Sequence, residues 1–324
     1  LLMLAFVPAL RRDRRWLWGV AVGGMLVTVA IPLTMLLQWV EGIDALETAG
    51  VAGAPMVRVD PLALWLDVLF GLAGLLAVLV MPSYLERAKA HRPEVYPLTF
   101  LALAGMTIMV ATESLVMIFL GLEALSIPLY VACGLNRDKE GSVEAALKYF
   151  LLGAFSTGFL VYGIALIYGA TGSLGLAEIG RTVAAGVEGG LLNQVMLLAG
   201  IGLFLVAFGF KVGAVPFHFW VPDVYQGAPT PITAFMAAGT KAAAFGVLIR
   251  VLHSGFSGSA VVESQWVTAL SFLAVLTMVG GNVLALVQQR VKRLLAYSSV
   301  AHAGYILLAM IAPVEVGAAN AVFY

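Results

Sequence analysis

The sequence predicts an all-α protein whose helices cross a membrane many times. Of its 324 residues, 61% are hydrophobic and only 11% are charged, and the mean hydropathy is +0.99. Soluble domains hold roughly 45–50% apolar and about 25% charged residues. Apolar stretches of about 20 residues, the length that spans a bilayer as a helix, recur along the whole chain. The composition therefore excludes a soluble domain and predicts a polytopic helix bundle.

Eleven apolar stretches are separated by short polar loops. We expect spans near residues 1–10 (partial), 16–40, 61–82, 95–112, 114–135, 143–169, 191–220 (broken), 224–252, 266–289, 294–312 and 316–324 (partial). Only Thr112 and Glu113 separate the fourth span from the fifth, so that turn is expected to be tight. The segment 170–190 is expected to be an ordinary external loop. Because both chain ends lie in apolar runs, we expect both to be truncated.

Lys and Arg are unevenly divided between alternate loops. Cytoplasmic loops of membrane proteins carry an excess of these residues. Twelve of the eighteen fall in the odd-numbered loops: Arg11, Arg12, Arg14, Arg15, Arg87, Lys89, Arg92, Arg137, Lys139, Arg290, Lys292 and Arg293. The even-numbered loops hold only Arg58 and Arg181, with Arg250 at a border. The pattern predicts that the odd loops are cytoplasmic and that the N-terminus lies outside.

Charged residues also lie inside the expected spans. They are Glu123, Lys148, Lys211 and Lys241, with Asp67 nearer the outer end of its span. A charge at the centre of a bilayer costs about 2.5–3.5 kcal/mol even on lenient scales. We therefore expect these side chains to pair with one another or to face water, and we interpret them as an ion path.

The stretch around Lys211 is the centre of that interpretation. Lys211 follows an uncharged run, residues 197–210, and precedes Pro216 by five positions. Proline removes an amide donor and clashes with the preceding turn, so the helix is expected to kink or break near the lysine. A broken membrane helix is tolerated where its freed carbonyls face protein or a water-filled cavity. The alternative is a snorkelling lysine at a helix end, followed by a proline-rich loop.

These groups predict proton transfer. Burial and a neighbouring opposite charge act in opposite directions on the proton affinity of a Glu–Lys pair, so a change in their separation exchanges protons near neutral pH. We expect Lys211 to pass a proton through water to Lys241, while Glu123 controls Lys211 or Lys148. His218 and His302 are candidate relays because histidine titrates near physiological pH. The alternatives are a static Glu123–Lys148 ion pair, a snorkelling Lys148 and a packing role for His302.

Several other chemistries find no support in the residues. Cys133 is the single cysteine, so the chain holds no disulfide or paired-thiolate site, and we expect it to pack as a small apolar residue. The four histidines, His91, His218, His253 and His302, are scattered along the chain, which argues against a haem or metal site. There is no phosphate-cradling glycine loop and no nucleophile elbow.

Residues 214–223, AVPFHFWVPD, with Lys211 upstream and Lys241 downstream, resemble the proton-conducting membrane subunits of respiratory complex I. Those subunits are related to multisubunit cation/proton antiporters. The continuation DVYQGAPTP at 223–231 is similar to the N-type subunits, the homologues of mitochondrial subunit 2. The segments 119–123, FLGLE, and 293–300, RLLAYSSV, also match the family, and the resemblance covers residues 95–312.

The resemblance implies fourteen helices with two inverted five-helix repeats, each containing a broken helix. Residues 1–94 would be N-terminal helices, 95–252 the first repeat with its break near 211–222, and 266–324 the start of the second. Glu123 would match the fifth-helix glutamate, Lys148 the sixth-helix lysine, Lys211 the broken-helix lysine and Lys241 the eighth-helix lysine. A further lysine in the second broken helix is expected beyond Tyr324.

The resemblance also implies a function. The chain would be a membrane subunit of a proton-translocating NADH:quinone oxidoreductase in a bacterial inner (plasma) membrane, without cofactor, metal or redox centre of its own. NADH, flavin, iron–sulfur clusters and quinone would belong to partner subunits. Its partners would be other membrane subunits, including homologous antiporter-like ones, and the lipid bilayer, with no nucleic acid. The alternatives are an Mrp-type cation/proton antiporter, a membrane-bound hydrogenase subunit and a structural bundle whose charges only brace assembly.

Overall fold

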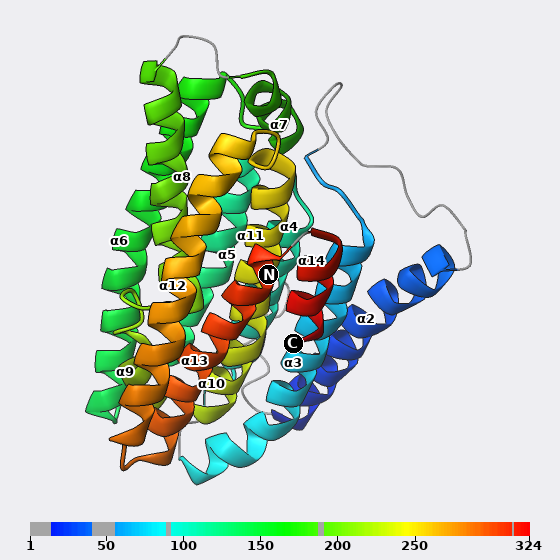
Figure 1. The fold of residues 1–324 in the computed structure, drawn as a ribbon. Helices are drawn as coiled ribbons and strands as arrows, with labels where there is room; N and C mark the ends of the chain where they lie inside the picture. The colour runs from blue at the N-terminus through cyan, green and yellow to red at the C-terminus, as the bar shows by residue number, and fades with distance from the viewer. Residues whose placement is uncertain (1–13, 41–55, 89–91, 187–190, 313) are drawn as a thin grey trace.

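The computed structural model describes residues 14–40, 56–88, 92–186, 191–312 and 314–324. Long helices lie side by side over most of these ranges (Figure 1). Within them, eight helices are long and apolar enough to cross a membrane. The protein is therefore a multi-pass helical membrane protein, as its composition predicts. The partial span expected at 1–10 lies outside the described residues.

The helices follow the predicted order closely. Their bounds are α2 Arg14–Val40, α3 Pro61–Arg87, α4 Val95–Val110, α5 Leu115–Cys133, α6 Glu140–Thr171, α7 Leu176–Ala185, α8 Leu191–Val212, α9 Val221–Gly227, α10 Thr230–Phe235, η1 Met236–Thr240, α11 Lys241–Arg250, η2 Val251–Gly255, α12 Ala260–Leu286, α13 Val291–Ile311 and α14 Val314–Phe323. The elements η1 and η2 are single π-helical turns within the continuous helix Thr230–Gly255. The tight turn expected between the fourth and fifth spans is confirmed, since α4 ends at Val110 and α5 begins at Leu115.

Two expectations about boundaries are wrong. The expected span 224–252 begins instead at Thr230, after a separate short helix, α9. Pro231 lies in the first turn of α10, where the missing amide donor of proline costs nothing. The expected loop 170–190 contains the helix α7, which lies across one end of the bundle (Figure 1). Leu176, Ile179 and Val183 share one face of α7 and are buried, so burial of this face against η2 holds the helix in place.

Neighbouring helices pack in pairs: α2 with α3, α4 with α5, α6 with α8, and α12 with α13. The pair α6 and α8 approaches closely at two glycines. A Cβ on Gly163 would lie 2.9 Å from the carbonyl oxygen of Gly200, and a Cβ on Gly200 would lie 2.9 Å from the carbonyl oxygen of Gly163. Only glycine permits this backbone approach, which fixes α6 against α8.

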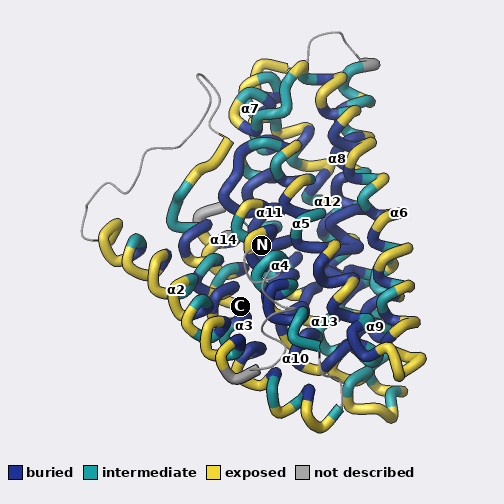
Figure 2. Tube along the Cα trace, turned by 180° about the vertical axis from the view of Figure 1, so that it is seen from behind, coloured by how far each residue is buried: buried dark blue, intermediate teal, exposed yellow. Residues whose placement is uncertain are grey.

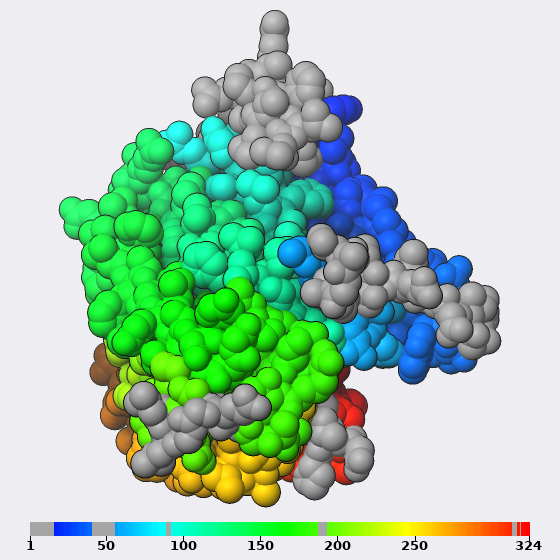
Figure 3. All heavy atoms as spheres, turned by 90° about the horizontal axis from the view of Figure 1, so that it is seen from above, coloured from blue at the N-terminus to red at the C-terminus, as the bar shows by residue number. Residues whose placement is uncertain are grey.

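Burial is concentrated where the helices meet, and the outer faces of the helices are exposed (Figure 2). Phe155 and Tyr162 on α6 and Phe272 on α12 are 68%, 61% and 64% exposed. Apolar surface of this kind is expected on helices that face lipid. The view down the bundle places the N-terminal helices at one edge, beside the continuous body formed by the rest of the chain (Figure 3).

A network of ion pairs joins three helices at the end of the bundle where α7 lies. Asp60, the N-cap of α3, accepts two hydrogen bonds of 2.8 Å from the guanidinium of Arg250, whose side chain is 4% exposed. Arg250 also donates through Nε to the carbonyl oxygen of Val110, 2.9 Å away, at the end of α4. Arg58 pairs with both Asp60 and Glu113. We refer to Arg58, Asp60, Glu113 and Arg250 as the clamp.

The clamp holds its charges in the ionised form. Burial of the Asp60 carboxyl acts to raise its pKa, but the hydrogen bonds from Arg250 and Ala63 and the charges of Arg250 and Arg58 together outweigh it, and the pKa lies below its ordinary value. The hydrogen bond and charge of Glu113 raise the pKa of Arg58 against the effect of burial. The clamp therefore fixes the end of the helix that carries Lys241 against α3 and α4.

Candidate functional site

The expected helix break is present, and Gly213 ends the helix. Its φ is 76°, in the left-handed region that glycine adopts without strain. The amide of Gly213 donates to the carbonyl oxygen of Phe210, and the amide of Ala214 donates to that of Gly209, 2.8 Å away. This pair of bonds is the Schellman motif that commonly ends helices. Pro216, which the sequence suggests as the cause of the break, lies four residues after Val212, where α8 has already ended.

Polar groups exposed by the break are bonded to other parts of the protein. The indole Nε1 of Trp220 donates to the carbonyl oxygen of Phe210 at 2.9 Å, and the amide of Val215 donates to Oγ1 of Thr277 on α12 at 3.0 Å. The irregular segment between α8 and α9 is therefore stabilised inside the bundle, as a broken membrane helix requires.

Lys211 is buried one position before the last residue of α8. Its residue is 3% exposed, so the snorkelling alternative is wrong for this lysine. Nζ donates to Oγ of Ser126 on α5 at 2.6 Å and lies 5.5 Å from the ring centroid of Tyr149 on α6. The carbonyl end of α8 and the face of the Tyr149 ring both favour a cation. The ammonium is thus bound by a hydroxyl, a ring and a helix end.

Glu123 on α5 is bound by a hydroxyl as well. Oγ1 of Thr157 on α6 donates to its Oε1 at 2.7 Å. Among the described residues, no cation lies within 4.0 Å of the Glu123 carboxylate. The static Glu123–Lys148 ion pair is therefore wrong. Lys148 and Thr157 are nine residues apart, two and a half turns at about 3.6 residues per turn, and so point to opposite sides of α6.

Lys148 belongs to a different cluster, at the end of the bundle where α9 lies. Nζ is 2.7 Å from Oδ2 of Asp223 on α9 and 2.6 Å from Oε1 of Glu144 on its own helix. Nη1 of Arg293 on α13 donates to the other oxygen of Asp223 at 2.6 Å. The Lys148 side chain is 40% exposed, so it lies nearer the helix end than the middle of the bundle.

Sequence reasoning did not assign Asp223 or Arg293 to the site. Both lie in the segments that carry the family resemblance, which was the available signal. Their opposite charges are 70 residues apart in sequence, and only the fold brings α9 beside α13. We refer to Glu144, Lys148, Asp223 and Arg293 as the entry cluster.

Lys241 begins α11, directly after the π-helical turn η1. It is 6% exposed, and Nζ donates to both the backbone oxygen and Oγ of Ser299 on α13, each 2.6 Å away. A Cβ on Gly213 would lie 4.0 Å from this Nζ. The ammonium of Lys241 is therefore beside the break that ends the helix of Lys211, and the structure brings the two lysines to one region.

The two candidate histidines lie apart from Lys211. His218 is half-buried in the segment after the break, and its ring centroid is 6.2 Å from that of Tyr297 on α13. His302 on α13 is exposed, and its Nδ1 is hydrogen-bonded to the hydroxyl of Tyr324. A cavity of about 350 Å³ is lined by both Lys241 and His302. His302 thus faces the same space as Lys241, whereas His218 lies near the break.

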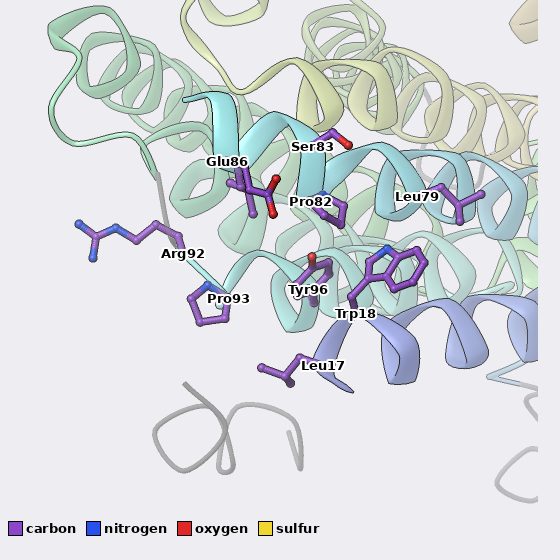
Figure 4. Close-up of a pocket in the computed structure, with 10 residues that line it drawn as sticks. Leu17, Trp18, Leu79, Pro82, Ser83, Glu86, Arg92, Pro93 and Tyr96 are labelled. Carbon is purple, nitrogen blue, oxygen red and sulfur yellow. The ribbon is translucent and has the colours of Figure 1, made fainter. Parts of the chain in front are cut away.

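A second pocket, of about 320 Å³, lies far from these residues in the fold. The start of α2, the end of α3 and the start of α4 form it, and Trp18, Glu86 and Tyr96 are among its lining residues (Figure 4). Figure 4 shows the Arg92 side chain extending away from the other labelled residues. The pocket contains none of the candidate residues, so we do not place the site there.

No group of three or more His, Cys, Asp or Glu side chains with metal-binding geometry is present in the described parts of the chain. Cys133 is buried, and its Sγ lies 3.5 Å from Sδ of Met236. The absence of a metal and of a cofactor from this chain stays a prediction.

Comparison with known families identifies the chain. A family described as NADH:quinone oxidoreductase/Mrp antiporter, TM, matches residues 112–324, which include every candidate residue. The chain belongs to this family. The family match begins just before α5 and runs through α14, so it covers the break, the two buried lysines and the entry cluster.

Individual relatives agree with this assignment. The chain is 47% identical over 290 residues to NADH-quinone oxidoreductase subunit N of Salinibacter ruber. The aligned residues cover 87% of this chain and 56% of that protein. A chain of respiratory complex I from Thermus thermophilus with bound aureothin shares 38% identity, with a TM-score of 0.72 over 92% of this chain and 59% of its own.

A chain of the Mrp complex from Dietzia sp. DQ12-45-1b has the same fold at 22% identity, with a TM-score of 0.81 over 99% of this chain and 58% of its own. The chain spans about three-fifths of the length of curated relatives that it matches. At 22% identity, the comparison with the Mrp complex shows the antiporter-like fold alone.

Proposed function

We propose that this chain is an N-type, antiporter-like membrane subunit of a proton-pumping NADH:quinone oxidoreductase and that it conducts protons through its buried charged residues. Lys211 carries this proposal. It is an almost fully buried ammonium at a helix break, and no carboxylate of the described residues lies within 4.0 Å of it. Such a cation gains and loses a proton more readily than one held in a salt bridge.

The remaining candidate residues have separate roles in this proposal. The entry cluster with Lys148 receives protons at the α9 end, which is the cytoplasmic side if the charge distribution of the loops sets orientation. Lys211 and Lys241 exchange the proton across the break, Glu123 controls the affinity of Lys211, and His218 and His302 are relays. Residues 1–94, 95–252 and 266–324 form the N-terminal helices, the first repeat and the start of an inverted second repeat.

The chain itself performs no redox step in this scheme. Quinone reduction by partner subunits, which hold the flavin, the iron–sulfur clusters and the NADH site, changes the distance between Glu123 and Lys211. Moving one charge against 100 mV costs about 2.3 kcal/mol. A displacement that alters the proton affinity of Lys211 by about two pH units supplies roughly 2.7 kcal/mol, which is enough for one proton.

The test is Lys211→Ala in the protein as it is made in the cell, assembled with its partners in sealed membrane vesicles. NADH:quinone activity and proton uptake are recorded side by side, after native gels have established normal assembly. We expect both rates to fall together. Wild-type values of both rates in an assembled variant would make Lys211 a bracing residue and overturn the proposal. Sodium-dependent transport without NADH would instead favour a cation/proton antiporter.

A further inference from the structure

A small cavity lies between α5, α6 and α8, beside the Lys211 ammonium. Its volume is about 10 Å³, and its lining includes Tyr130, Ser156, Thr157 and Lys211. A cavity of this size holds about one water molecule where polar groups in its wall can bind it. Ser156 donates its hydroxyl hydrogen to the carbonyl oxygen of Ala207 at 3.1 Å, so the polar groups left to bind a water include the Thr157 hydroxyl and the Lys211 ammonium.

Thr157 connects this cavity to Glu123. Its hydroxyl hydrogen is donated to Oε1 of Glu123 at 2.7 Å, which leaves the lone pairs of Oγ1 free to accept from a water. Lys211 uses one of its three N–H donors on Ser126. A water in this cavity can accept an N–H from Lys211 and donate to Thr157, so that each hydrogen bond along this route points from Lys211 toward Glu123.

The geometry points to Thr157 as a positioning residue that, with one water, forms a proton wire between Lys211 and Glu123. This inference rests on the proposed function and adds to it the means by which the two charges communicate without an ion pair. Thr157 holds the Glu123 carboxylate through a hydrogen bond of 2.7 Å and lines the same cavity as Lys211. The two groups are thereby coupled through hydroxyl and water.

The transfer balances without any other reactant. One N–H bond of the Lys211 ammonium breaks as the proton moves to the water, the water passes a proton to Thr157, and Thr157 passes its own to Glu123. One O–H bond forms on the carboxylate, while the water and the hydroxyl end with the atoms they began with. An ammonium and a carboxylate become an amine and a carboxylic acid, which the apolar surroundings accommodate more easily.

The first test compares Thr157→Val, which keeps the shape of the side chain and loses the hydroxyl, with Thr157→Ser, which keeps the hydroxyl. We expect the rate of proton pumping, and of NADH oxidation with it, to fall about tenfold in Thr157→Val, because a hydrogen bond to a charged group is lost, and both rates to stay within about twofold in Thr157→Ser. Thr171→Val is the matched control on the same helix, since its hydroxyl bonds only to Ile167 and the adjacent turn. It is expected to pump normally.

A second readout separates positioning from packing. The infrared carboxylate band of Glu123, assigned by its loss in Glu123→Gln, is expected to shift in Thr157→Val and to stay in place in Thr157→Ser and Thr171→Val. An unchanged band with normal pumping in Thr157→Val, while Lys211→Ala abolishes pumping, would overturn the wire and leave the proposed function standing. Normal pumping in Lys211→Ala would overturn the proposed function itself.

The unaltered complex provides a test that does not depend on a variant that folds. A density map at a resolution that shows ordered water is expected to contain one water within hydrogen-bond distance of both Oγ1 of Thr157 and Nζ of Lys211. A dry cavity in such a map would overturn the inference.

Discussion

The buried cation of the clamp and the two buried lysines have opposite kinds of partner. In the clamp, Arg250 meets the carboxylate of Asp60 with two hydrogen bonds of 2.8 Å. Lys211 and Lys241 are equally buried, but their ammonium groups donate to neutral oxygens, those of Ser126 and Ser299. A cation paired with a carboxylate is held in its charged form, whereas a cation bound by neutral oxygens can lose its proton without leaving a lone carboxylate behind.

The comparison separates the charges that stabilise this bundle from those that transfer protons. Burial does not distinguish them, because Arg250, Lys211 and Lys241 are 5%, 3% and 6% exposed. What distinguishes them is whether the partner of the cation is a carboxylate or a neutral oxygen. Removing Arg250 takes away the two hydrogen bonds of the Asp60 carboxylate and leaves it with Arg58 alone, 3.5 Å away, whereas removing a cation bound by hydroxyls leaves no carboxylate without its partner. The predictions below test that distinction, beginning with the largest expected effect on stability.

Arg250→Met is expected to destabilise the protein most. Breaking a buried ion pair by removing one partner costs about 3–5 kcal/mol, and here it also leaves the carbonyl oxygen of Val110 without its donor. The measurement is the midpoint of thermal unfolding of the purified complex, with the amount assembled in the membrane as a second readout. We expect a lower midpoint and less assembled protein.

The control for Arg250→Met is Arg181→Met. Arg181 is paired with Glu178 on the exposed face of α7, and its side chain is 75% exposed. An exposed pair of this kind contributes about 0–1 kcal/mol. If the two variants unfold at the same temperature, the clamp is no more than a surface contact and the comparison fails.

The clamp should also give the protein a pH dependence of known sign. Burial acts to raise the pKa of Asp60, but Arg250, Ala63 and Arg58 together outweigh it, and the pKa in the folded protein is lowered. Its contribution to stability is therefore complete above the ordinary aspartate pKa of about 3.9 and is lost as the pH falls through the lower folded value. Thermal unfolding of the wild type and of Asp60→Asn is compared from pH 6 downward. We expect the gap between them to narrow below about pH 4; a gap that widened on acidification would contradict this assignment.

The entry cluster lies between the two cases, because its charges are paired but partly exposed. Asp223→Asn removes the carboxylate shared by Lys148 and Arg293, whose side chains are 40% and 31% exposed. Exposure screens such pairs, so we expect a loss of about 1 kcal/mol in stability. We also expect proton uptake to slow by about fivefold, since about 1 kcal/mol corresponds to that factor when roughly 1.4 kcal/mol corresponds to tenfold. Glu144→Gln, which removes only the more exposed of the two carboxylates bound by Lys148, is the control and should change less.

The sequence contains enough to predict the bundle, the buried lysines and the break, because apolar length and isolated charges are local properties. It does not contain the rotation of each helix about its axis, which decides the partner of Glu123. Thr157 and Lys148 both lie on α6, and only the packing against α5 and α8 turns Thr157 toward the carboxylate. The helix α7 was missed for another reason: its apolar face of Leu176, Ile179 and Val183 is readable, but its short length and flanking glycines suggested a loop.

Lys241→Met should have the smallest effect on stability and a large effect on transfer. Methionine has a similar length and no charge. When the ammonium is removed, the two Ser299 oxygens remain within helix α13, where the backbone oxygen keeps its helical role. We expect the free energy of unfolding, measured from the shift of the midpoint, to change by less than about 1 kcal/mol. We expect the rate of proton pumping to fall at least about tenfold, because the interaction that is lost is about as strong as a hydrogen bond to a charged group. The same substitution at Arg250 is the matched comparison. If Lys241→Met destabilised the protein as much as Arg250→Met, the lysines bound by neutral oxygens would be braces like the clamp, and the distinction between the two groups would be lost.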